Sequence, residues 1–291
     1  MLKNSTYRRV AITSLFLLVS LILYNYPEYE VVMLEEQKNG YNEIYLGDKN
    51  NYVSLVKSSC ISEHKDVLSI YSSLVSEECI PEGFKSYIPE STRIIDYSIN
   101  DHLLKVNFSK EFLNVKEDDE RKLIEMLVYS FTMIDEVKDI MIFVDGKLLD
   151  KLPNSLERVP VILDRSYGIN KIVDITSFKE IENINVYYLN KDAEYYYVPV
   201  TYVVNSNDDV VNMVIKKLKS NSLGSSLLTH LTNDVEVVDY DVEEEKLSIL
   251  FNKELNKILF DGELNEEVKY ALVNSFADTL GVKYVDILVS P

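Results

Sequence analysis

The chain has 291 residues, of which 48 are acidic and 30 basic, giving a net charge of −18. This length exceeds one average domain and allows two of roughly 100 to 150 residues. Because an acidic surface repels phosphate groups, we expect no nucleic-acid partner, and anionic lipids and wall polymers are disfavoured as direct partners of the folded part.

The first element in chain order is an apolar segment over residues 10–26. Basic residues stand before it and glutamates follow it. These flanks predict a cytoplasmic amino terminus and extracytoplasmic domains in a single-pass protein of the cell membrane. The segment is near the lower length limit for a span, so a signal-peptide core and a buried helix are alternatives. With no small-x-small cleavage pattern behind it, a signal anchor over residues 1–30 is favoured.

Two cysteines follow, Cys60 and Cys79. In an oxidising compartment they can form a disulfide, whereas free cysteines that pack as small apolar side chains are the alternative. The three histidines are scattered and give no ligand spacing for a metal. We therefore expect neither a metal site nor a cofactor.

The remainder of the chain contains an internal repeat, in which the same sequence pattern occurs twice. Residues 94–112 align without gaps on residues 237–255 at an offset of 143, and further along, after two extra residues near Asp261 and Gly262, the offset becomes 145. A unit of this length predicts two whole domains rather than a solenoid of short repeats. The expected boundaries are a first domain over 41–166, a linker over 167–182 and a second domain over 183–291.

Each copy shows the element order β-β-α-β-β-α-β. The first copy has expected strands at 43–46, 52–57, 94–99, 103–108 and 140–144, with helices near 67–75 and 118–134. The second copy repeats this order, and Ser206 and Asn207 are the expected caps of its first helix. The predicted fold class is α+β, with an antiparallel or mixed sheet in each copy and both helices on one face of that sheet.

Eight polar positions are kept in both copies and are the candidate contact or structural residues: Asp96, Tyr97, Lys110, Glu111, Asp239, Tyr240, Lys253 and Glu254. A catalytic role would need a second acid, a nucleophile or a metal beside them, and the repeat offers none. We therefore expect no catalytic residue and no enzyme. A structural role in the strands and loops is favoured, and an exposed repeated loop could also meet a partner.

Tyrosines gather in the first strand pair of the second copy: Tyr187, Tyr188, Tyr195, Tyr196, Tyr197 and Tyr202. Such a row could stack on saccharides, which suggests a peptidoglycan or wall-glycan binding module as an alternative function. Strand propensity explains the same residues without a ligand.

The stretches LLKVNFSKEF, LIEMLVYSFTMIDEVKDI and MIFVDG of the first copy resemble the sporulation and spore germination (GerM) domain, and KLSILFNKEL of the second copy is similar to it. The resemblance covers nearly all of residues 41–291 and identifies a tandem two-domain member. It implies a non-enzymatic protein of the spore-forming cell envelope that assembles or localises a sporulation or germination complex through protein contacts. Members of this architecture are commonly lipoproteins, yet no cysteine stands directly behind segment 10–26.

Overall fold

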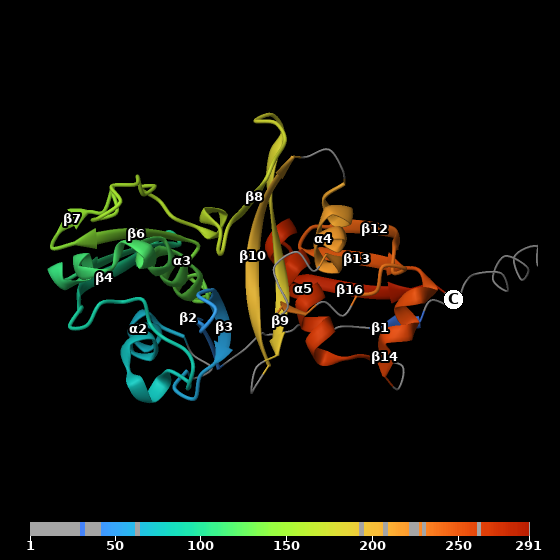
Figure 1. Cartoon of the computed structure of the whole chain (residues 1–291), viewed down its shortest axis with the longest axis horizontal. Coiled ribbons are helices and arrows are strands. Elements are labelled where there is room, and N and C mark those ends of the chain that lie inside the picture. The colour runs from blue at the N-terminus through green and yellow to red at the C-terminus, as the bar shows by residue number, and fades with distance from the viewer. Residues whose placement is uncertain are drawn as a thin grey trace, which may run out of the picture.

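The computed structural model describes residues 30–32, 42–61, 65–191, 195–205, 209–220, 227–228, 231–260 and 263–290. The predicted element order occurs twice along the chain (Figure 1). No helix among these residues is long and apolar enough to cross a membrane. The predicted anchor over residues 10–26 lies outside the described residues.

The first copy runs from strand β2 to strand β7. Its elements are β2 (Glu43–Gly47), β3 (Val53–Lys57), α2 (Val67–Val75), η1 (Glu77–Cys79), β4 (Ile94–Asn100), β5 (Leu103–Phe108), η2 (Lys110–Asn114), η3 (Glu117–Asp119), α3 (Glu120–Phe131), β6 (Asp139–Val144) and β7 (Lys147–Leu148). A connector with η4 (Arg165–Tyr167) and β8 (Ile172–Asp174) leads to the second copy.

The second copy repeats the order with a few short additions. Its elements are β9 (Ile181–Lys191), β10 (Tyr195–Asn205), α4 (Val210–Lys219), β11 (Leu227–Leu228), β12 (Val237–Glu243), β13 (Lys246–Phe251), η5 (Lys253–Ile258), β14 (Leu259–Phe260), β15 (Glu263–Leu264), α5 (Glu266–Leu280) and β16 (Tyr284–Val289). One further strand, β1 (Glu30–Val32), precedes both copies.

The first helix of each copy begins at an aspartate in the same repeat position. The Asp66 carboxylate accepts hydrogen bonds from the backbone N–H groups of Leu68 and Ser69, and the Asp209 carboxylate accepts one from Asn212. Each aspartate thus satisfies donors that the first helical turn leaves free. The expected cap at Ser206 and Asn207 is wrong, since Asp209 caps α4 and those two residues lie outside the described part.

The expectation of one sheet per copy is also wrong. Strands β4-β5-β6-β7 form an outer sheet of the first copy, and β1-β16-β13-β12 form its counterpart in the second. The strand pairs β2-β3 and β9-β10 instead join each other in a six-stranded central sheet of order β11-β9-β10-β3-β2, with β8 beside β10. The helices therefore lie between the central sheet and an outer sheet, rather than covering one face of a single sheet (Figure 1).

Helix α3 has the burial that this layered arrangement requires. All residues from Leu123 to Phe131 are buried, including Glu125 and Ser130. A helix that covers one face of a sheet keeps a polar stripe toward water, whereas a helix between two sheets is covered on both sides. The apolar stripe of Leu123, Leu127 and Phe131 is real, but the opposite side of the helix is buried as well.

One edge of each outer sheet, the one beside β6 or β16, is covered by a further strand, and the two copies do this differently. In the first copy β7 turns back and pairs with β6. In the second copy β1 pairs with β16, with Val31 opposite Leu288. An open strand edge is a template for unwanted pairing, so both arrangements protect the sheet.

Cys60 and Cys79 form a disulfide with a Cα–Cα distance of 5.4 Å. This selects the first of the two alternatives that the sequence leaves open. The bond ties the end of the β2–β3 segment to turn η1 behind helix α2, and Cys79 is itself buried.

The two copies meet where β3 pairs with β10, at Leu55 opposite Tyr197. Next to this pair, the side-chain amide of Asn170 bridges the two strands. Its Oδ1 accepts from the backbone N–H of Val53 at 2.9 Å, and its Nδ2 donates to the carbonyls of Val53 and Pro199, both at 2.8 Å. One connector side chain thus satisfies backbone groups of both copies.

Helix α3 in turn holds Asn170. The Glu125 carboxylate, only 5% exposed, accepts a hydrogen bond from the Asn170 backbone N–H at 3.0 Å. Burial raises the pKa of Glu125 to about 7, against the opposing effects of this hydrogen bond and of the cations Lys171, Lys122 and Arg121. The junction therefore contains a carboxyl group that keeps its proton to a higher pH than an exposed glutamic acid does.

Further polar contacts cross the interface between the copies. Arg165 Nη1 of the connector lies 2.7 Å from Asp278 Oδ1 of helix α5, and the hydroxyls of Tyr45 and Tyr187 lie 3.3 Å apart across the two copies. On the other side of the junction Tyr270 donates to Glu43 at 2.7 Å, and Tyr196 donates to Asp48 at 3.1 Å. Pairing of these groups offsets the cost of removing them from water. The copies are therefore joined by specific polar contacts as well as by the shared sheet.

We expect Asn170→Ala to lower the free energy of unfolding by about 3 kcal/mol, because it leaves three backbone groups beside the β3–β10 pair without a partner. Urea unfolding followed by circular dichroism measures this. Asn183→Ala is the matched control, since the Asn183 amide makes a single bond of 3.3 Å at an exposed position. Equal losses in the two variants would contradict the role of Asn170.

We expect the wild-type chain to lose stability relative to Glu125→Gln as the pH rises from about 4.5 to about 7. The folded state binds the Glu125 proton more tightly than the unfolded state, so this stabilisation is complete below the ordinary carboxyl pKa and is lost as the pH passes the folded one. The difference in free energy of unfolding should fall by about 3 kcal/mol over this window and then level off. A difference that is constant or rises with pH would contradict the assignment.

Candidate functional site

The repeated aspartates lie at a β-bulge in each outer sheet. The register of β4 shifts between Ile94 and Asp96, and that of β12 shifts between Val237 and Asp239. Asp96 accepts from the side-chain amide of Asn107 on β5 at 2.8 Å. Since position 250 in the second copy is a leucine, Asp239 has no such neighbour and accepts its hydrogen bond from the Tyr240 backbone N–H.

The repeated tyrosines differ between the copies. Tyr97 is 41% exposed on β4. Tyr240 is half-buried, and its hydroxyl donates to Asp209, the residue that caps helix α4. This hydrogen bond to Asp209 raises the pKa of the Tyr240 phenol. Tyr240 therefore connects strand β12 to a helix start, while Tyr97 presents its ring toward solvent.

The repeated Lys-Glu pairs begin the 3-10 turns η2 and η5 that follow β5 and β13. Hydrogen bonding from Ser109 lowers the pKa of Glu111, and the partner Lys257 lowers that of Glu254. Phe112 and Leu255, the next residues, are buried and anchor the two turns. The groups that shift the pKa of these two acids thus lie within their own turns.

The structure brings the repeated residues together only within each copy. Ile94 is opposite Phe108 and Val237 is opposite Phe251, so the aspartate and the Lys-Glu pair of one copy lie at the same open end of their hairpin. The two sets lie on opposite sides of the central sheet (Figure 1). They form no common site.

A repeated surface feature lies beside these residues on the edge strands. Ile95 on β4 is 53% exposed, and Val238 on β12, at the same repeat position, is 57% exposed. Among the described strands, β4 pairs only with β5 and β12 only with β13. Each copy therefore presents an outer strand edge with an exposed aliphatic side chain, a form that an added strand of a partner can recognise.

Four of the six tyrosines of β9 and β10 are not accessible to a sugar. Tyr187, Tyr188, Tyr196 and Tyr202 are all at least 94% buried, and their hydroxyls bond within the protein. Tyr197 stacks on Tyr270 of helix α5, with ring centroids 4.0 Å apart. The clustering of tyrosines, which suggested glycan stacking, is thus explained by packing of the central sheet.

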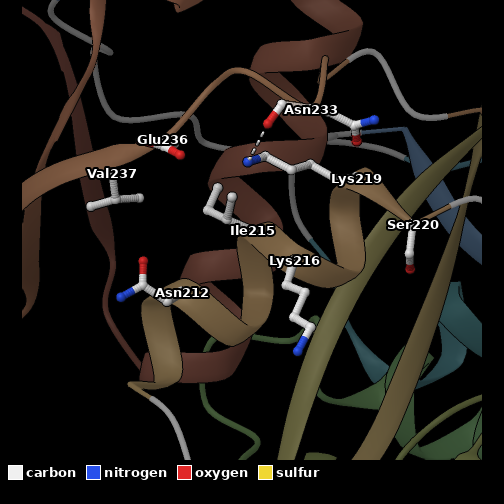
Figure 2. A pocket seen from close by; sticks show the side chains of 8 residues that line it. All are labelled: Asn212, Ile215, Lys216, Lys219, Ser220, Asn233, Glu236 and Val237. Atoms are coloured by element: carbon white, nitrogen blue, oxygen red, sulfur yellow. Dashed lines mark hydrogen bonds between the residues drawn. The ribbon is translucent and has the colours of Figure 1, made fainter.

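A pocket of about 440 Å³ lies between helix α4 and the segment before β12 (Figure 2). It is lined by Asn212, Ile215, Lys216, Lys219, Ser220, Asn233, Glu236 and Val237. Lys219 Nζ donates to the Asn233 carbonyl at 3.2 Å, and Lys216 points away from it. Lysines in the last turn of a helix also complement its negative end. The polar groups here do not converge on one point, as a binding site would require.

Within the described parts of the chain, no group of three or more His, Cys, Asp or Glu residues could hold a metal ion. The contacts that matter most for the architecture involve Asn170, Glu125, Arg165 and Asp278, and none of them was identified from the sequence. Arg165 and Asn170 lie in the connector, outside the repeat, so the alignment of the copies gives no signal for either.

Comparison with known proteins identifies the family. The family model described as Germane, sporulation and spore germination, matches residues 43–150 and 185–290. The spore germination protein GerM of Bacillus subtilis (strain 168) is 27% identical over 261 residues, covering 85% of this chain and 71% of that protein. The solved tandem GerMN domains of the same B. subtilis protein superimpose with a TM-score of 0.76 at 25% identity, covering 89% of this chain and 91% of theirs. This chain is therefore a tandem-domain member of the sporulation and spore germination family.

Proposed function

We propose that this chain is a non-enzymatic, membrane-anchored, extracytoplasmic protein of the spore-forming cell envelope. It assembles or localises a sporulation or germination complex through protein contacts. Membership of the family supports a sporulation-related role, and the disulfide is compatible with an oxidising compartment outside the cytoplasm.

The paired outer edges of β4 and β12 are the observation on which this proposal depends. The central sheet fixes the two copies, so Ile95 and Val238 lie on outer edges at a set separation. A rigid body with two similar edges can hold two partner strands at a defined spacing. The remaining repeated residues support these edges by shaping the bulges and the turns next to them.

We expect deletion of the gene in the source organism to reduce the number of heat-resistant spores, and the wild-type gene to restore it. The combined substitution Ile95→Lys and Val238→Lys should restore about tenfold fewer spores, because a charge replaces the apolar contact on each edge. Leu156→Lys, at a residue 67% exposed in another loop, is the matched control. Immunoblots confirm equal protein levels.

Two outcomes would contradict the proposal separately. Normal spores after the deletion would argue against the role in sporulation. A deletion defect that the edge variant fully repairs would leave that role intact but would exclude the β4 and β12 edges as the contacts.

We expect the folded domains to be digested by protease added to intact protoplasts, and the chain to remain with the membrane after alkaline carbonate washing. An alkylating reagent should label Cys60 and Cys79 only after reduction, because the disulfide occupies both thiols. Protease resistance in intact protoplasts that disappears after lysis would place the domains in the cytoplasm and contradict the proposal.

A further inference from the structure

The segment from the end of helix α2 to the start of strand β4 surrounds a groove of about 650 Å³, lined by residues between Val75 and Thr92. We call it the α2–β4 groove. Two tight turns that both begin at a proline belong to its lining. In the first the Phe84 N–H donates to the Pro81 carbonyl at 3.1 Å, and in the second the Thr92 N–H donates to the Pro89 carbonyl at 3.2 Å. Because proline fixes its own φ angle, both turns are partly preorganised by the sequence.

Contacts with the rest of the fold hold this segment in place. The disulfide fixes Cys79 at the end of η1, and Lys85 exchanges two backbone hydrogen bonds of 2.8 Å with Gly47 of β2. The Phe84 ring packs edge-on against Tyr196 of the second copy, with ring centroids 4.9 Å apart. A partner that binds in the groove therefore does not have to order the segment first.

The groove offers apolar surface to a side chain of a partner. Val75 is 41% exposed, and Ile80, Pro81, Phe84 and Pro89 line the same hollow while half-buried. Apolar surface of this kind is suited to one inserted aliphatic or aromatic side chain.

Glutamates accompany this apolar surface. Glu77, Glu82 and Glu90 line the groove, and all three are exposed. No ion pair in the described part of the chain includes any of them. Nor do they converge on one ion, since no group of three or more His, Cys, Asp or Glu among the described residues could hold a metal. These carboxylates are therefore available to separate cationic groups of a partner.

The nearby basic residues do not neutralise these glutamates. Lys85, the single basic residue of the lining, lies 3.6 Å from Asp119 Oδ1, outside the groove. Arg93, which follows the segment, lies outside the lining as well. Its charge acts on Glu111 of turn η2, where it adds to the larger effect of Ser109 in lowering the pKa of that acid. The lining thus has a net charge of −2.

These properties select the kind of partner. A peptide segment in which lysine or arginine stands beside an apolar side chain complements both the glutamates and the apolar surface. Anionic lipids and anionic wall polymers are repelled by the same glutamates and by the net charge of −18 for the whole chain. An uncharged glycan would leave the three carboxylates without a role.

The second copy lacks the residues that preorganise the groove. At the repeat offset of 143, Pro81 and Pro89 correspond to Gly224 and Thr232, and Cys79 corresponds to a serine. The two prolines and the disulfide thus occur in the first copy alone. A contact made through the groove would therefore be specific to the first copy.

We propose that the α2–β4 groove binds a segment of an envelope protein in which an apolar side chain is flanked by lysine or arginine. The apolar side chain packs against Val75 and its apolar neighbours, and the basic side chains pair with Glu77, Glu82 and Glu90. This inference rests on the proposed function and names the chemistry of the partner. Because Thr92 lines the groove two residues before β4 begins, one partner can contact both the groove and the β4 edge.

The test places a photoreactive phenylalanine analogue at position 75 of the full-length chain in sporulating cells. Position 156, which is 67% exposed and outside the groove, is the matched control. We expect light to produce one discrete protein adduct from position 75 and none from position 156. Mass spectrometry then maps the adduct to a segment with lysine or arginine beside an apolar residue. A synthetic peptide of that mapped sequence is the probe for binding measurements.

We expect the combined substitution Glu77→Gln, Glu82→Gln and Glu90→Gln to weaken binding of this peptide to the full-length chain by at least about tenfold. The matched control is the combined substitution Asp135→Asn, Glu136→Gln and Asp150→Asn. It removes the same charge from exposed acids outside the groove and should leave binding unchanged. Both triple variants should unfold at the wild-type temperature, because none of the six side chains is buried.

Several outcomes would overturn the inference. They are adducts to lipid, to glycan or to a second copy of this chain, a mapped segment without lysine or arginine, no adduct specific to position 75, and equal binding by the two triple variants.

The outcome also separates this inference from the proposed function. If the gene deletion reduces spore numbers and the gene with the three groove substitutions restores them fully, the groove is not the contact and the sporulation role stands. If the deletion has no effect on spores, the proposed function itself fails.

Discussion

The architecture depends on the pairing of β3 with β10. Strand β3 belongs to the β2–β3 hairpin and strand β10 to the β9–β10 hairpin, so each has one edge that its own hairpin does not pair. Leaving such an edge buried without partners would forfeit several backbone hydrogen bonds. Pairing across the copies satisfies both edges, and the Asn170 amide supplies the remaining partners beside the Leu55–Tyr197 pair. The layered order of sheets and helices follows from this one junction.

Burial of polar groups between the copies is a consequence of the shared sheet. Tyrosines of β9 and β10 fill the interface with large rings, and their hydroxyls find acceptors on neighbouring elements. The interface is therefore specific as well as apolar, since each buried polar group needs its own partner. The B. subtilis tandem domains superimpose over 89% of this chain, a share that includes both copies together. The same relative arrangement of the two domains is thus found in both structures.

Both copies retain the hairpin with its β-bulge, the aspartate that caps the first helix and the 3-10 turn after the hairpin. All three depend on local contacts. The contacts around these repeated features differ between the copies. Asn107 supports Asp96 in the first copy, whereas Tyr240 bonds to Asp209 in the second. The edge of β6 is closed by β7, and the edge of β16 is closed by β1. The retained features are local and their surroundings differ. A function that depends on surface contacts is consistent with this, because the outer surfaces are where the two copies can differ.

The sequence by itself determined the twofold repeat, the order β-β-α-β-β-α-β and the approximate ends of the strands and helices, because periodicity and capping are local properties of the chain. It also determined the family, through stretches such as LLKVNFSKEF. Only the tertiary structure decided that β2-β3 and β9-β10 share one sheet, that Cys60 and Cys79 are bonded, and that the residues between Val75 and Thr92 surround a groove. The alternation of apolar residues in a strand reports that it is buried but not which strand lies beside it, and that choice is made by contacts between residues more than 100 positions apart.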